Sequence, residues 1–179
     1  DFISDILLIS LAVEPPLILV PGILATDVAL RTLCEALGKA GCGLLELEPG
    51  ELQAEHRPAL TEGGPLGTEA EIYIYDTLPG GAGFAQRVGN LGLRVFVEAL
   101  RILESCPDDC DRSCYRCLRS YKNRLEHEML DRHLGASLLR YLIYGSVPKP
   151  EGKRLDQSTD MLFEDLMRQR SGRYAFERN

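Results

Sequence analysis

The chain has 179 residues, a length that suits one domain with a single core. It is 45% hydrophobic and 26% charged, as ordinary globular proteins are. Its net charge of -7 argues against a wholly basic nucleic-acid binder but is compatible with a local basic patch. No apolar run approaches the roughly 20 residues of a membrane span, and we find no leader peptide. We therefore expect a cytoplasmic protein without a membrane partner, and its start at Asp1 suggests a piece of a longer protein.

The N-terminal third of the chain predicts a strand, a helix and a second strand. The apolar run Ile6–Val13 has the pattern of a strand that is buried on both faces. A helix is expected to begin at Thr26 or Asp27 and to end at the three glycines between positions 38 and 43. A short strand around Leu44–Leu47 should follow, and an acidic, solvated loop should then extend to residue 71.

The clearest strand is Ile72–Tyr75, which is β-branched and aromatic throughout. A helix is expected to begin within Ala85–Val88, and a largely buried helix over Leu93–Glu104 leads directly to Cys106. Leucines at four-residue steps from Leu130 indicate another helix, which Gly145 ends.

These elements predict an α/β fold, with α+β as the alternative: a small mixed sheet flanked by helices, and a four-cysteine loop between two core helices. We expect residues 1–147 to form one domain. Residues 148–179 should be a linker, followed by a short amphipathic helix over Asp160–Arg170.

Four cysteines with the spacing C-x3-C-x3-C-x2-C form the strongest motif, at positions Cys106, Cys110, Cys114 and Cys117. Turn-forming residues lie between them, and four soft ligands on tight turns are what a tetrahedral divalent metal requires. The spacing favours a structural zinc site that has no open coordination position.

Two alternatives to zinc remain at this point. A disulfide pair is disfavoured because we expect a reducing compartment. An iron–sulfur cluster fits the spacing of Cys110, Cys114 and Cys117, but Cys106 would close its open iron position, and the chain is too short for a barrel. The remaining cysteines, Cys34 and Cys42, are expected to be a core thiol and a loop thiol. We expect none of the three histidines, His56, His127 and His133, to be a ligand.

A glycine-rich loop follows the strand at Tyr75 and includes Gly80, Gly81 and Gly83. Its simplest interpretation is a tight strand-to-helix turn. Its backbone N–H groups could also form an anion-binding nest, for which a nucleic-acid phosphate is the expected ligand. A third interpretation gives Asp76 a catalytic role on nucleic acid, although no further carboxylates or lysine stand in an obvious place beside it.

A basic segment follows the first cysteines of the loop. Tyr115 and Tyr121 are interleaved with five basic residues, which are Arg112, Arg116, Arg119, Lys122 and Arg124. Basic side chains give salt-dependent affinity for phosphate, and tyrosine rings can stack on unpaired bases. The same positive charges could instead balance the thiolates and pack against the helix, and the two interpretations are compatible.

Three motifs in this order resemble the MrfA-type zinc-binding domain, formerly a domain of unknown function. They are the strand and glycine loop Ile72–Phe84, the four cysteines with the following Leu118–Asn123, and Leu130–Arg132. The resemblance covers most of the chain but not the tail from Pro148. This bacterial family occurs at the C-terminus of superfamily-two DNA helicases, such as the mitomycin repair factor, and in antiphage proteins such as DrmB of DISARM.

The resemblance implies that Cys106, Cys110, Cys114 and Cys117 bind zinc. It also implies an ATPase or translocase module, in the same protein or in a partner subunit, because this chain has no Walker A loop and no helicase core. We therefore expect a zinc-stabilised, non-catalytic accessory domain of a DNA helicase, for DNA repair or antiphage defence, that supports DNA binding and motor assembly. The alternative is a pure protein-docking module of a defence system, and a nucleic-acid enzyme using Asp76 is the third interpretation.

Overall fold

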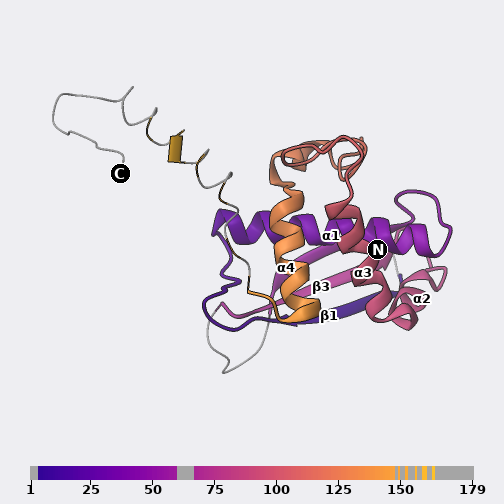
Figure 1. The fold of residues 1–179 in the computed structure, drawn as a ribbon. Coiled ribbons are helices and arrows are strands. Elements are labelled where there is room, and N and C mark those ends of the chain that lie inside the picture. Colours follow the sequence, from indigo (N-terminus) through magenta and orange to yellow (C-terminus); the bar gives the residue numbers. More distant parts are fainter. Residues whose placement is uncertain are drawn as a thin grey trace. The chain divides into compact units, whose positions relative to one another are not determined.

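The computed structural model describes residues 4–59 and 67–147, and beyond them only positions 149, 152, 156, 159, 160 and 163 (Figure 1). The chain divides into two compact units, residues 1–147 and residues 148–179. Most of the helix predicted over Asp160–Arg170, and part of the acidic loop predicted up to residue 71, lie outside the described residues.

The first unit is built on a three-stranded sheet. Its strands are β1 (Ile6–Ala12), β2 (Leu52–Pro58) and β3 (Glu69–Asp76), in the spatial order β1-β3-β2. Both neighbouring pairs are antiparallel, so the sheet is not mixed as we predicted, and the α+β alternative is the one confirmed. Ile72 at the centre of β3 lies opposite Ile9 of β1 and His56 of β2.

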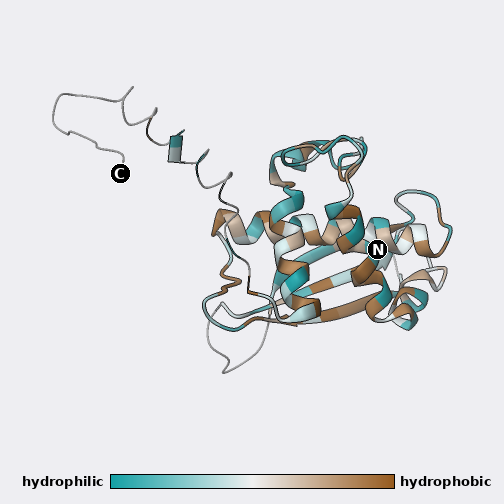
Figure 2. Cartoon of the chain, viewed as in Figure 1, coloured by the Kyte–Doolittle hydropathy of each residue, from teal (hydrophilic) through white to brown (hydrophobic). Residues whose placement is uncertain are grey.

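The described residues cover only one face of the sheet. Leu11, Ile72 and Ile74 are buried in the core, which they share with residues of the helices. On the other face Ile6 and Leu8 of β1 are 64% and 51% exposed, and β1 is mostly apolar along its length (Figure 2). The prediction that this strand is buried on both faces was therefore wrong. An apolar run does not reveal whether a second layer covers the sheet, because that depends on the tertiary structure.

Helix α1 (Leu24–Leu44) is longer than predicted and continues through all three glycines. A Cβ atom at Gly41 would lie 3.1 Å from Cδ1 of Leu52 and 3.2 Å from Cγ2 of Val88, so this glycine lets the helix approach β2 and α2 closely. The predicted strand at Leu44–Leu47 is wrong, because α1 and the turn after it occupy these residues, and the strand forms later, as β2.

The start of α1 also differs from the prediction. The residue before the helix is Ile23, whose side chain makes no capping hydrogen bond. Asp27 instead lies in the first turn, where its carboxylate accepts a hydrogen bond from the backbone N–H of Gly22 at 3.1 Å. A negative charge in the first turn is favourable next to the unpaired N–H groups of a helix.

Four further elements complete the unit. Helix α2 (Phe84–Leu91) contacts β1 and β3, and helix α3 (Leu93–Glu104) packs on α1. A 3-10 helix, η1 (Arg124–Met129), precedes helix α4 (Arg132–Tyr144), which packs on both α1 and α3. The four-cysteine loop therefore lies in the chain between α3 and α4, as predicted. No helix in the described part of the chain has the length and apolarity needed to cross a membrane.

Candidate metal centre and its surroundings

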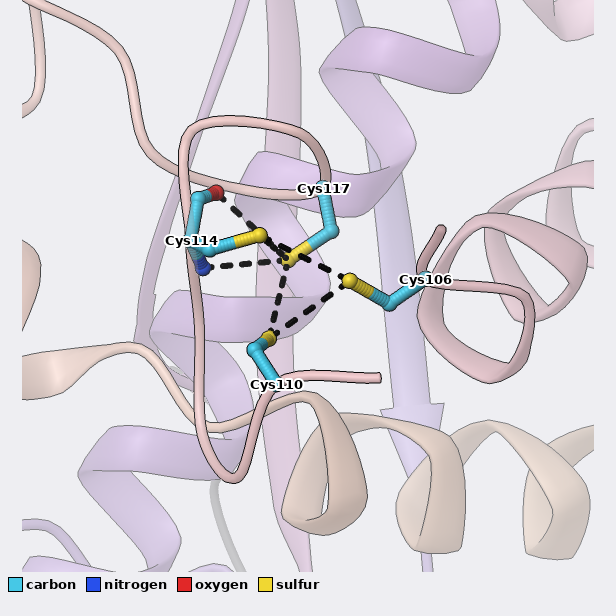
Figure 3. Close-up of side chains that lie close together, drawn as sticks. All are labelled: Cys106, Cys110, Cys114 and Cys117. Atoms are coloured by element: carbon cyan, nitrogen blue, oxygen red, sulfur yellow. Dashed lines mark hydrogen bonds between the residues drawn. The ribbon is translucent and has the colours of Figure 1, made fainter. Parts of the chain in front are cut away.

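The four cysteines of the loop come together in space. Their Sγ atoms all lie within 4.8 Å of one another, and this is the one cluster of His, Cys, Asp or Glu residues in the described ranges that could hold a metal ion. The Sγ atom of Cys106 is 3.6 Å from those of Cys110 and Cys114, and the Sγ atoms of Cys110 and Cys117 are 3.7 Å apart. Figure 3 shows the four side chains pointing toward a common centre. Four thiol ligands with this convergence suit a tetrahedral zinc ion.

The second half of the loop is organised by its own backbone. The backbone N–H groups of Cys117, Leu118 and Arg119 all donate to the carbonyl oxygen of Cys114. The N–H of Cys114 in turn points at Sγ of Cys117, at 3.2 Å. Lys39 of α1 also donates to the carbonyl oxygen of Cys117, at 2.9 Å. Cys114 and Cys117 are thus positioned by a compact turn that is anchored to α1.

The first half of the loop depends on α4. Cys106 follows the end of α3, and the N–H of Asp109 closes a turn onto its carbonyl oxygen. Arg132, the first residue of α4, donates from Nε to the carbonyl oxygen of Cys110 at 2.6 Å and from its terminal nitrogen to Oδ1 of Asp109 at 2.6 Å. Arg132 belongs to the Leu130–Arg132 motif, but no local pattern in the sequence predicts this contact with the loop.

The thiols have unequal acidities. Burial opposes ionisation of Cys106, but hydrogen bonds from the backbone N–H groups of Cys110 and Asp108 outweigh it and lower the pKa of Cys106 to about 7. Burial and the neighbouring thiols raise the pKa of Cys110, and burial raises that of Cys117. Several thiolates at this separation repel one another, so all four ionise together only around a cation. The donor set therefore fits a divalent metal.

The basic segment divides into side chains that hold the fold and side chains that face solvent. Arg112 donates to the carbonyl oxygen of Glu128 at 2.9 Å and lies 3.5 Å from the carboxylate of Asp131. Arg119 donates to Oγ of Ser113 at 2.9 Å. Arg116 is exposed. These contacts give Arg112 and Arg119 structural roles, although the Arg112 side chain is still 43% exposed, whereas Arg116 faces solvent and can meet a ligand.

The rest of the basic segment lies near exposed tyrosines. Tyr121 is 76% exposed, and the guanidinium of Arg124 lies over its ring, 4.5 Å from the centroid. Tyr115 is 68% exposed and meets His127 edge-on. Lys122 is exposed and lies 3.5 Å from the carbonyl oxygen of Pro49. Aromatic rings beside cations on an exposed surface are typical of both nucleic-acid and protein contacts.

A groove of about 640 Å³ adjoins this segment, between α1, β2 and residues 116–126. Its lining includes Lys39, Arg116 and Lys122. Three carboxylates also line it, and these pair with the buried Arg31: Glu35 at 3.3 Å, Glu55 at 3.2 Å and Glu126 at 3.0 Å. Three negative carboxylates share one positive guanidinium, so this cluster has a net negative charge. The groove therefore has an acidic cluster as well as a basic one.

The glycine loop is filled by a carboxylate of the chain itself. Asp76 is fully buried and accepts hydrogen bonds from the backbone N–H groups of Ala82 at 2.6 Å, Phe84 at 3.0 Å and Ala85 at 2.7 Å. Three glycines of this loop, Gly80, Gly81 and Gly83, have φ angles of 91°, 73° and 75°, which glycine adopts without strain. These contacts favour the tight-turn interpretation, and binding of an external anion there stays a prediction.

The remaining candidate residues lie apart from the cysteine cluster. Cys34 is fully buried in α1, and its Sγ atom is 3.9 Å from Nδ1 of His56. Burial raises the pKa of Cys34 to about 12, so it behaves as a core thiol. Cys42 is also buried rather than lying in a loop, because α1 extends through it.

Comparison with known proteins agrees with this site. Residues 33–118, which include all four cysteines, match the model of the MrfA Zn-binding domain. The Druantia protein DruE of Escherichia coli (strain UMEA 4076-1) is 38% identical over 159 residues, which are 83% of this chain and 8% of that protein. The chain thus spans a small part of this relative's length.

A solved structure, the DUF1998 helicase MrfA bound to DNA, aligns with 71% of this chain and 15% of that one, at 16% identity and a TM-score of 0.49. The family match coincides with four converging thiols that suit zinc, so the cofactor is a structural zinc ion. Residues 33–118 of the chain therefore correspond to an MrfA-type zinc-binding domain.

Proposed function

We propose that this chain is a non-catalytic accessory domain of a DNA helicase or translocase, or of an antiphage defence complex. The observation that carries the proposal is the convergence of the four thiols within the stretch that matches the MrfA Zn-binding domain. In this proposal Cys106, Cys110, Cys114 and Cys117 are the zinc ligands. The metal stabilises the junction between α3 and α4, and residues 1–147 act as the functional domain, with residues 148–179 as a linker and tail.

A structural role for the zinc follows from its ligands. Four thiolates complete a tetrahedral shell and leave no position for substrate or water. Asp76 is fully buried, and its carboxylate already accepts hydrogen bonds from three backbone N–H groups. These contacts do not favour a catalytic role for Asp76. The domain is therefore proposed to contribute binding and assembly, and the ATPase activity belongs to a module outside this chain.

Metal content and folding test the zinc site. Elemental analysis of the purified chain should give one zinc per molecule and no iron. Cys114→Ser should lose zinc and unfold more readily, because metal binding and folding are coupled. Cys34→Ser is the control, since Cys34 is buried away from the cluster and its loss should leave zinc content unchanged. Iron in place of zinc, or a stable metal-free Cys114→Ser variant, would contradict the structural role.

The proposed contact with DNA uses the exposed part of the basic segment. Arg116 and Lys122 face solvent and line the groove together with Lys39, while Tyr121 offers an exposed ring at the same place. Cations attract phosphate without regard to sequence, and the exposed ring can stack on an unpaired base. The domain would then help to hold or guide DNA that the motor moves. Cytoplasmic location in a bacterium is part of this proposal.

Charge reversal on this surface tests the contact. Arg116→Glu with Lys122→Glu should weaken DNA binding and reduce the salt dependence of the affinity by about one counterion for each lost phosphate contact. The matched control is Arg94→Glu with Arg101→Glu, which changes the charge equally on the exposed face of α3. If both double variants lose affinity to the same extent, general charge explains binding. If neither does, DNA contact through this segment is wrong.

A second candidate function is protein docking, and the uncovered sheet face favours it. Ile6, Leu8, Tyr73 and Tyr75 lie on that face, and the chain spans only 8% of its DruE relative, so most of such a protein lies outside this domain. The occupant in this proposal is an apolar surface of the motor module to which the domain belongs. Leu8→Glu in the full-length parent should then separate the domain from the motor in limited proteolysis, while Leu93→Glu, at an exposed position of α3, should not.

A further inference from the structure

We propose that Arg132 is a positioning residue for the metal, because it holds the half of the loop that carries Cys106 and Cys110. The side chain is nearly fully buried, at 6% exposure for the residue. Its guanidinium reaches three separate groups: the carbonyl oxygen of Cys110 at 2.6 Å, the carboxylate of Asp109 at 2.6 Å and the carbonyl oxygen of Leu103 at 3.4 Å. One side chain thus connects the end of α3 to the loop. The inference rests on the zinc site proposed above.

The two halves of the loop differ in how they are held. Three backbone N–H groups converge on the carbonyl oxygen of Cys114, so the half with Cys114 and Cys117 is organised locally. Between Cys106 and Cys110, by contrast, the turn is closed by one backbone hydrogen bond, which the N–H of Asp109 donates to the carbonyl oxygen of Cys106. Asp109 itself has a positive φ of 42°, which a residue other than glycine adopts at some cost in free energy. Contacts from outside must therefore stabilise this half.

Arg132 is suited to this role by its chemistry. A guanidinium is planar, always charged and able to donate several hydrogen bonds at once. Here it donates to a carbonyl oxygen of one ligand residue and to a carboxylate in the same turn, and its backbone N–H donates to the carbonyl oxygen of Arg112 at 2.7 Å. Its positive charge also offsets part of the net charge of about −2 that four thiolates and a zinc ion carry. The residue therefore favours the arrangement in which all four thiolates face the metal.

Zinc release measures this role. Residues that orient metal ligands typically change metal affinity by about 10- to 100-fold when they are replaced. Arg132→Met should therefore release zinc to a chelating dye about 10-fold or more faster than the wild type under native conditions. Arg132→Lys keeps the charge but has no planar fork, so its release rate should lie between the two. Cobalt-substituted protein gives an independent readout, because a distorted tetrahedral site shifts the cobalt d–d absorption bands.

Two control variants separate positioning from general destabilisation. Leu139→Ala removes a fully buried side chain from the same helix, away from the loop, and should lower the free energy of unfolding by about 2–5 kcal/mol. Arg140→Met removes a partly exposed arginine of α4 that pairs with Glu104. Neither should alter the cobalt spectrum, and Arg140→Met should leave zinc release unchanged.

The outcomes decide between the explanations. Faster release from Arg132→Met than from Leu139→Ala, with the cobalt bands shifted only in the Arg132 variant, supports the proposal. Equal release rates from the two variants at comparable unfolding free energies would show that Arg132 only stabilises the fold. If Arg132→Met does not fold, Arg132→Lys carries the test, and an unchanged cobalt spectrum with wild-type release would overturn the proposal. Wild-type protein that contains no zinc would instead refute the metal site itself.

Discussion

The hydroxyl group of Thr32 accepts a hydrogen bond from the backbone N–H of Asp131, with 2.9 Å between the two atoms. Thr32 is fully buried in α1, and Asp131 is the residue immediately before α4. The same threonine side chain packs against Gly135, one turn into α4. This contact joins the longest helix of the domain to the helix that supports the cysteine loop, so changes at this junction should affect the whole unit.

Gly135→Ala should destabilise the domain although alanine is the better helix former. A Cβ atom at this position would lie 2.6 Å from Cγ2 of Thr32 and 3.2 Å from Cδ1 of Leu103, so α4 would have to move away from α1. Overpacking typically costs about 1–3 kcal/mol, which the gain of about 1 kcal/mol in helix propensity offsets only in part. Chemical denaturation of the zinc-loaded protein measures the difference.

Gly43→Ala is the matched control for this prediction. Gly43 lies in α1, where a Cβ atom would meet nothing within 4 Å. The same substitution should therefore leave the free energy of unfolding unchanged or raise it by up to about 1 kcal/mol. A loss of stability as large as that of Gly135→Ala would show that steric contact with Thr32 is not the cause.

Asp131→Ala should weaken α4 at its first turn. The carboxylate accepts hydrogen bonds from the N–H groups of His133 at 2.9 Å and Leu134 at 3.2 Å, and it lies 3.5 Å from the guanidinium of Arg112. Loss of such a cap costs about 0.5–2 kcal/mol. Thermal and chemical denaturation should both report the loss.

Asp131→Asn separates the cap from the charge. Asparagine caps helices about as well as aspartate, but it carries no charge opposite Arg112. This variant should therefore retain most of the stability that Asp131→Ala loses. Equal losses in the two variants would mean that the ion pair with Arg112 outweighs the cap.

Asp76→Asn should destabilise the turn between β3 and α2. The NH2 half of an asparagine amide would face one of the backbone N–H groups that now donate to the carboxylate, so two donors would oppose each other. The amide would also carry no charge to strengthen the remaining hydrogen bonds. Hydrogen bonds to a buried charged group contribute about 1.5–3 kcal/mol, and we expect a loss of about 2–3 kcal/mol in the free energy of unfolding. Asp5→Asn is the control: its carboxylate accepts from the N–H of Gly83 at 3.0 Å but is exposed, and it should change stability by less than about 0.5 kcal/mol.

His56 should make the domain less stable in mild acid. Burial, together with the positive charge of Arg31, lowers the pKa of His56 below its usual 6.5, although Glu55, Asp27 and Glu126 act in the opposite direction. The unfolded chain then binds a proton near pH 6.5 that the folded protein does not bind until lower pH. The stability that the folded environment of neutral His56 contributes is therefore present in full above pH 6.5. It is lost as the pH falls through the folded-state pKa of His56.

A comparison between wild type and His56→Gln isolates this effect. Acid also protonates the cysteines, but that contribution is common to both proteins and cancels in the difference between them. Between about pH 8 and pH 5.5, the unfolding free energy of the wild type should fall more steeply than that of the variant. Parallel pH profiles would show that His56 titrates alike in the folded and unfolded states.

The sequence alone identified what depends on residues close together in the chain. The spacing of the four cysteines and the turn residues between them predicted a structural zinc, because a metal loop is built from ligands only a few residues apart. The strand at Ile72–Tyr75 and the helix at Leu93–Glu104 were also predicted, since periodic apolar residues define them. Periodicity failed at α1, where the three glycines do not end the helix and Gly41 serves close packing, and at β2, which lies in a stretch that composition assigned to a loop.

Only the tertiary structure decided which distant groups meet. It brought Arg132 onto the carbonyl oxygen of Cys110, engaged Arg112 and Arg119 in internal contacts, and placed Lys39 of α1 at the carbonyl oxygen of Cys117. It also left Ile6 and Leu8 of β1 exposed on the sheet face that the described residues do not cover. A hydrogen bond between residues far apart in the chain depends on how helices pack, and packing responds to volumes and close approaches, as at Gly135, that no local pattern encodes. The spacing of the cysteines therefore predicted the metal site, whereas no local pattern predicted the side chains that support it.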